Sequence, residues 1–187
     1  MFRQAKYLLA GLLISGVLLA EQRPGVWLDV PFVKQEKDAC GAASIAMVMQ
    51  YWQHQPGQPP AAAGSSDERR IQLSLYSAQA HGIYASDLEH YLQGHGFQTF
   101  AFHGDWELLR EHLQKGRPLI VALKAGRDLH YVVVVGVDWQ KGVILKNDPA
   151  QRKLLQQDRS EFEREWNATG AWTLLALPQG DDPSPSP

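Results

Sequence analysis

The pattern of apolar residues changes from helical to strand-like near residue 118, and this change limits the folds open to the chain. Before it, apolar residues recur three and four positions apart, as in amphipathic helices. After it, β-branched residues alternate with other residues, as in strands. Helices are predicted over residues 39–52, 67–80, 86–94, 105–115 and 158–166, and strands over 97–102, 118–123, 130–138, 143–146 and 172–177. Helices followed by strands predict an α+β fold with an antiparallel sheet.

The two ends of the chain differ from the middle. Arg3 and Lys6 precede an uncharged apolar run over residues 7–20. This run is shorter than the roughly 20 residues of a transmembrane helix, and basic residues before such a run are typical of a secretory signal. Cleavage after Ala20 and retention as an N-terminal anchor both remain open. We predict a signal or anchor over 1–20, one domain over 21–177 and a disordered tail over 178–187.

Composition excludes several classes of function. A net charge of -2 over 187 residues gives no reason to expect nucleic acid as a partner. The histidines are dispersed and no CxxC or HExxH motif occurs, so neither a metal site nor a cofactor is predicted. The signal-like segment predicts export, to the periplasm or the medium, with membrane association through residues 7–20 if that segment is retained.

Cys40 is the only cysteine of the chain and lies at the start of a predicted helix. Asp38 is predicted to be the N-cap, which places Cys40 at the second helical position. There the unpaired backbone N–H groups and the positive end of the helix dipole favour a thiolate. The small residues 41–43 are expected to let a substrate backbone approach the sulfur. On its own, a single cysteine is more often a small buried residue than a nucleophile.

His130 and Asp148 flank a predicted hairpin whose turn lies near residues 139–142. A turn centred on 139 sets His130 opposite Asp148, and one centred on 140 makes them diagonal neighbours on the same face. Taken singly, His130 reads as a strand-end residue bonded to the backbone, and Asp148 as the start of an Asx-Pro turn. Taken with a cysteine at a helix N-terminus, the pair fits nucleophilic thiol catalysis.

Gln35, residues 40–43, residues 130–136 and the Asp148-Pro149 pair together resemble the C39 peptidases, a family of papain-like thiol proteases. The best-known members are the N-terminal peptidase domains of bacteriocin ABC exporters, which cut leader peptides after a Gly-Gly pair. The resemblance extends over residues 30–177. It implies a papain-like cysteine peptidase fold, in which the helical part carries the catalytic cysteine and packs on an antiparallel sheet.

The resemblance also implies a role for each matching residue. Cys40 corresponds to the nucleophile, His130 to the general base and acid, and Asp148 to the residue that orients the histidine. Gln35 matches the glutamine whose amide forms the oxyanion hole with the Cys40 backbone N–H. Gln35 lies five residues before the cysteine, where six is usual in the exporter domains. No GxxxxGK[ST] loop occurs, so ATP use is not expected within this polypeptide and any exporter would be a separate partner.

The sequence therefore predicts an exported cysteine peptidase that hydrolyses peptide bonds in a peptide or protein substrate. By resemblance, the cleavage site would follow Gly-Gly in a leader-type peptide. Two alternatives remain open at this point. One is a thiol acyltransferase or amidase on the same fold, and the other is a peptide-binding module without turnover.

Overall fold

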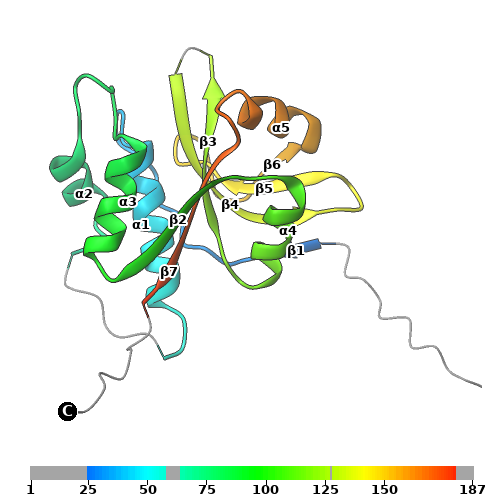
Figure 1. The fold of residues 1–187 in the computed structure, drawn as a ribbon, viewed down its shortest axis with the longest axis horizontal. Coiled ribbons are helices and arrows are strands. Elements are labelled where there is room, and N and C mark those ends of the chain that lie inside the picture. Colours follow the sequence, from blue (N-terminus) through cyan, green and yellow to red (C-terminus); the bar gives the residue numbers. More distant parts are fainter. Residues whose placement is uncertain (1–24, 58–63, 127, 180–187) are drawn as a thin grey trace, which may run out of the picture.

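The computed structural model describes residues 25–57, 64–126 and 128–179 (Figure 1). The elements in this part of the chain are β1 (Gly25–Trp27), α1 (Cys40–Gln53), α2 (Glu68–Leu75), α3 (Ala85–Gly94), β2 (Phe97–His103), α4 (Trp106–Gln114), β3 (Leu119–Ala125), β4 (Asp128–Asp138), β5 (Val143–Asn147), β6 (Leu155–Asp158), α5 (Arg159–Asn167) and β7 (Trp172–Pro178). The strands form one sheet in the order β2-β7-β3-β4-β5-β6, with β1 added beside β4. Every pairing is antiparallel, so the predicted α+β class is confirmed.

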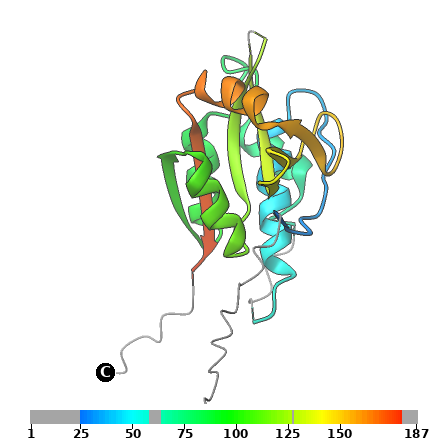
Figure 2. The same ribbon diagram turned by 90° about the vertical axis from the view of Figure 1, so that its right-hand side faces the viewer.

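Helices cover both faces of the sheet. In Figure 1, α1, α2 and α3 lie on one side of the strands, and α4 and α5 lie on the other. Figure 2, turned by 90°, again places α5 above α4. Along β4, Tyr131 and Val133 face the cluster under α1, while Val132 and Val134 face the cluster under α4 and α5. Because both faces are buried, β4 is apolar at successive positions instead of alternating with polar residues.

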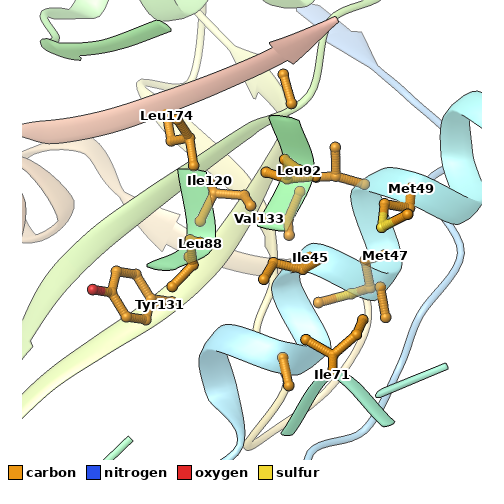
Figure 3. Packing of buried hydrophobic residues seen from close by; sticks show 14 of the residues in the cluster. Ile45, Met47, Met49, Ile71, Leu88, Leu92, Ile120, Tyr131, Val133 and Leu174 are labelled. Atoms are coloured by element: carbon orange, nitrogen blue, oxygen red, sulfur yellow. The ribbon is translucent and has the colours of Figure 1, made fainter. Parts of the chain in front are cut away.

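The helix α1 is buried along most of its length, within the cluster drawn in Figure 3. Gly41, Ala42 and Ala43 are all buried in the protein core, and the expectation that they let a substrate backbone approach the sulfur stays a prediction. A Cβ atom on Gly41 would lie 3.2 Å from the Cβ of Ile83 and 3.4 Å from Cδ1 of Leu88. The small side chains allow α1 to pack closely against the segment that leads into α3.

Three helix starts or ends differ from the predictions. Asp38 is not the N-cap of α1, because its backbone is left-handed (φ 57) and Ala39 takes that position. Asp tolerates this conformation better than most residues, and the sequence pattern cannot separate the two uses. Ser86 lies inside α3, whose N-cap is Tyr84. The helix α2 ends at Leu75, because Ser77, two residues later, forms an isolated antiparallel β-bridge with Gly82.

The strand β6 was not predicted, and two predicted segments cannot be compared fully. The sequence of β6, Leu-Gln-Gln-Asp, has weak strand propensity and is held by pairing with β5. The predicted signal over 1–20 lies outside the described residues, as does 180–187 of the predicted tail. Pro178 ends β7, and the Gln179 N–H donates to the Gly96 carbonyl at 2.8 Å. Among the described helices, none combines the length and the apolar character needed to span a bilayer.

Replacing Gly136 by alanine tests the packing of β1 on β4. The added Cβ would lie 2.6 Å from the Val26 carbonyl oxygen and 2.8 Å from the Trp27 Cβ, both on the facing strand. We expect Gly136→Ala to lower the free energy of unfolding by about 1–3 kcal/mol, because backbone must shift to admit the methyl group. Urea denaturation would measure the change.

The matched control is Gly94→Ala at the end of α3, where a Cβ meets no atom within 4 Å. This variant should be as stable as the parent protein or slightly more stable, since alanine favours the helix by up to about 1 kcal/mol. Equal urea midpoints for Gly136→Ala and the parent protein would contradict the close contact between β1 and β4.

Candidate active site

Cys40 is the first residue of α1 and is partly exposed. The Ala39 carbonyl accepts the first hydrogen bond of the helix, from the Ala43 N–H at 2.9 Å. No side chain caps this end of α1. The N–H groups of the first turn therefore have no partner within the helix, and the positive end of the helix dipole lies next to the sulfur. Cys40 lies in the first helical turn, as predicted, but it is the first helical residue and not the second, because Ala39 is the N-cap.

The β4–β5 hairpin brings His130 and Asp148 to the same face. Val133 pairs with Asn147, and continuing this register sets Ala150 opposite His130. Asp148 is then the diagonal neighbour of His130, as the second of the two predicted registers required. The register shifts by one residue between Val134 and Gly136. Without that β-bulge, the number of positions between Asp148 and the residue paired with His130 would be odd. Because side chains alternate along a strand, Asp148 would then face the other side of the sheet.

The imidazole of His130 lies beside both expected partners. His130 Nε2 lies 2.8 Å from Asp148 Oδ1. The Cys40 side chain lies close enough to the ring to raise the pKa of His130, and because Asp148 occupies Nε2, Nδ1 is the nitrogen left for the thiol. Burial lowers the pKa of His130, but the bonds and charges of Asp148 and Cys40 outweigh burial and raise the pKa to about 9. The ring is therefore an imidazolium at neutral pH.

Asp148 is 1% exposed, and its carboxylate accepts hydrogen bonds from more groups than the sequence predicted. Its Oδ1 also accepts the Ala150 N–H at 3.0 Å, and its Oδ2 accepts Gln151 Nε2 at 2.9 Å. Lys146 Nζ lies 3.9 Å from Oδ2. Burial raises the pKa of Asp148, but the hydrogen bond and charge of His130, the charge of Lys146 and the Ala150 N–H outweigh it and lower the pKa. Asp148 thus starts an Asx turn and holds the imidazole at the same time.

Sequence reasoning missed Lys146 and Gln151 as partners of Asp148. Gln151 follows Asp148 by three residues, within the turn that Asp148 starts, so the turn signal was present but its glutamine was not used. Lys146 lies two residues before Asp148 at the end of a strand, so the two side chains point to the same face. A lysine in a strand is usually exposed. Its burial, with 4% of its surface exposed, could be found only from the packing of β6 and α5 over β5.

Gln35 is placed beside the turn that follows Asp148. Its backbone N–H donates to the Pro149 carbonyl at 3.0 Å, which ties the segment before α1 to the end of β5. The side-chain oxygen Oε1 is buried and has no hydrogen-bond partner among the described residues. A buried amide oxygen without a partner is costly and marks a position where an added group can bind. The oxyanion-hole role of Gln35 stays a prediction.

Asn147 connects the site to the rest of the fold. This fully buried residue donates from Nδ2 to the Val30 carbonyl at 3.2 Å. Its Oδ1 accepts the Leu154 N–H at 3.0 Å. The residue before Asp148 is therefore bonded both to the strand-like segment that leads to Cys40 and to the loop that leads to β6. These bonds fix the direction in which Asp148 leaves β5.

A cavity of about 300 Å³ lies on the Asp148 side of the imidazole. Its wall includes His130, Asp148 and Lys146, together with Glu161 and Glu165 of α5. Cys40 and Gln35 are not among the residues that line it. Within the described ranges, no group of three or more His, Cys, Asp or Glu side chains is arranged to hold a metal ion.

Replacing Asp148 by asparagine tests the origin of the His130 pKa. The parent protein should show one histidine that titrates near pH 9, because the imidazolium is stabilised in the folded state. Asp148→Asn removes the carboxylate, so the His130 pKa should fall well below 9. The ring-proton NMR signals of His130, assigned with His130→Ala, would measure both values.

The control for this titration is Asp105→Asn. Asp105 is the N-cap of α4, where asparagine caps equally well, so the His130 titration should not change. A His130 pKa that stays near 9 in Asp148→Asn would contradict the assignment of the shift to the carboxylate.

Comparison with known proteins identifies a family that matches this chain. The model of the Peptidase_C39 like family matches residues 27–173, which is most of the chain. No curated protein matches the sequence. Several solved structures share the fold.

Three of these structures show the extent of the likeness. A proposed C39-like peptidase of Bacillus anthracis has 17% sequence identity and a TM-score of 0.66, covering 84% of this chain and 99% of its own. The peptidase domain of Streptococcus ComA, a bifunctional ABC transporter of a quorum-sensing pathway, has 25% identity and a TM-score of 0.62, covering 79% and 98%. A double glycine motif protease from an AMS/PCAT transporter, in complex with a leader peptide, has 21% identity and a TM-score of 0.60, covering 82% and 95%.

Proposed function

The chain belongs to the Peptidase_C39 like family and is a cysteine peptidase, and we propose that Cys40, His130, Asp148 and Gln35 carry out its reaction. The observation that supports this assignment best is the position of the His130 imidazole, which bonds to Asp148 at 2.8 Å and lies close enough to Cys40 for the thiol to raise its pKa. These residues come from the start of α1, from β4 and from the end of β5. A structural role could account for each residue alone, but an imidazolium beside the only thiol of the chain is the arrangement of thiol proteases.

In the proposed reaction, the Cys40 thiolate attacks the carbonyl carbon of a peptide bond. The carbonyl becomes an oxyanion, which accepts hydrogen bonds from the Cys40 backbone N–H and from the Gln35 amide. The His130 imidazolium gives its proton to the leaving amine as the C–N bond breaks, and a thioester remains on Cys40. Neutral His130 then removes a proton from water, which hydrolyses the thioester, and the thiolate–imidazolium pair is restored.

Asp148 does not exchange protons in this scheme. Its carboxylate accepts a bond from His130 Nε2 and so keeps the other ring nitrogen toward the sulfur. Because Asp148 is buried and holds additional donors, its own position is fixed before substrate binds. The catalytic geometry is thus largely formed in the free protein.

The uncapped start of α1 supports the oxyanion site. The first-turn N–H groups, including that of Cys40, lack helical partners and lie at the positive end of the dipole. The Gln35 amide has a buried oxygen, and a half-turn about its last side-chain bond would exchange this oxygen for the NH₂ donor. The Gln35–Pro149 backbone bond holds that amide near the end of β5.

We propose a Gly-Gly-containing leader-type peptide as the substrate. Support comes from two similar structures, of which one is named a double glycine motif protease bound to its leader peptide and the other belongs to a transporter. We further propose that the chain is exported through residues 1–20 to the periplasm or the medium, and that it meets its substrate there or beside a separate exporter.

Replacing Cys40 tests the function. Cys40→Ala should abolish cleavage of Gly-Gly-containing peptides, because covalent catalysis is lost, while the thermal unfolding temperature stays close to that of the parent protein. Mass spectrometry of the products identifies the bond that is cut. Products joined to an added amine would assign an acyltransferase, and peptide binding without cleavage by the parent protein would assign a binding module.

Replacing Gln35 tests the oxyanion hole separately. Gln35→Ala should lower kcat by about 10²–10³-fold with a smaller change in KM, since the donor acts mainly in the transition state. Lys34→Ala, at the exposed neighbouring position, is the control and should retain the parent rate. A kcat in Gln35→Ala within about twofold of the parent value would remove Gln35 from the oxyanion hole.

A further inference from the structure

Lys146 is a buried ammonium group next to the proposed catalytic residues. It lies on β5, two positions before Asp148, with 4% of its surface exposed. Its Nζ donates to Gln157 Oε1 at 2.8 Å and lies 3.9 Å from Asp148 Oδ2. A buried ammonium is costly unless an anion compensates it. Gln157 is neutral, so the Asp148 carboxylate is the anion that Lys146 contacts.

The other charges near Lys146 come from two elements. The strand β4 contributes His130, which shares the cavity wall with Lys146. The helix α5 contributes Glu161 and Glu165, also on the cavity wall. Both have other partners, since Arg164 pairs with Glu161 at 3.8 Å and Gln157 Nε2 donates to Glu165 at 2.9 Å. The cavity residues contributed by β3 and β6 carry no charge.

We propose that Lys146 is a positioning residue whose charge balances Asp148, so that the Cys40 thiolate and the His130 imidazolium coexist at a lower pH than they otherwise would. This inference rests on the thiolate–imidazolium pair of the proposed function. The four groups then carry two positive and two negative charges, and the cluster is neutral.

Loss of the Lys146 charge should disturb this balance in a defined direction. The cluster of Cys40, His130 and Asp148 would then be net negative once the thiol ionises. Each further loss of a proton would add to that negative charge, so thiolate formation would move to higher pH. For charges about 10 Å apart at an effective dielectric constant of about 20, Coulomb's law gives a shift of just over one pH unit, which screening by salt reduces to roughly half a unit to one unit.

The electrostatics of the two partners agree with this role. Burial lowers the pKa of Lys146, and the charges of Asp148, Glu165 and Glu161 oppose that effect. In turn, the charge of Lys146 is among the causes that lower the pKa of Asp148. The lysine and the carboxylate therefore stabilise each other's charged form.

The test is the rate of alkylation of Cys40 by iodoacetamide as a function of pH, followed by protein mass. The chain has a single cysteine, so every adduct reports on Cys40. In Lys146→Met the midpoint of the rate profile should lie roughly half a unit to one unit above that of the parent protein. Lys146→Arg, which keeps the charge, should return the midpoint toward the parent value. Lys146→Gln, which is neutral but still polar, should shift it as Lys146→Met does.

The matched control is Lys141→Met. The Lys141 side chain is 78% exposed and pairs with Asp138 at the far end of β4, so its loss should leave the midpoint unchanged. Equal midpoints for folded Lys146→Met or Lys146→Gln and the parent protein would overturn the proposal. Failure of both neutral variants to fold would also overturn it, by assigning Lys146 a role in stability.

Alkylation requires no peptide substrate, so this result is independent of the cleavage assays. A parent profile that is unaffected by His130→Ala would show that the thiolate–imidazolium pair itself is absent, which contradicts the proposed function. A parent profile that depends on His130 but not on Lys146 contradicts only the present inference.

Discussion

The arrangement of the candidate site depends on the hydrogen bond between His130 and the buried carboxylate of Asp148. A carboxylate with 1% of its surface exposed is stable only if several groups compensate its charge. Here the imidazolium, a backbone N–H, an amide and a lysine all do so. The bond that each group makes to Asp148 helps to fix the backbone segment that carries the group. The carboxylate therefore orders the turn after β5 as well as the histidine.

The packing of the fold explains why these groups meet. The strand β4 lies inside the sheet with helices on both faces, so its position is set by apolar contacts on either side. The small residues at the start of α1 let that helix approach closely and place Cys40 at the end of the sheet where His130 lies. Asn147 and Gln35 add polar bonds that join the segment before α1 to the end of β5. A site held by packed elements in this way needs little rearrangement to act.

The likeness to solved peptidases is high in fold and low in sequence, with 17% to 25% identity among the three structures compared. This combination is expected where burial and alternation define the fold, because many apolar residues satisfy the same pattern. The residues around the proposed triad are less free to vary, since each must supply a particular donor or acceptor. In its proposed role, Lys146 is one such residue, since its ammonium lies 3.9 Å from the Asp148 carboxylate.

The sequence by itself determined the α+β class, the position of Cys40 in the first turn of a helix and the hairpin that joins His130 to Asp148. These features are local, because periodicity and turn residues act over a few positions. Tertiary structure decided the rest. The one-residue bulge in β4 places Asp148 on the same face as His130. The left-handed backbone of Asp38 makes Ala39 the N-cap of α1. The packing of α5 and β6 buries Lys146. Each of these outcomes depends on contacts between segments far apart in the chain, whose energies a local pattern does not contain.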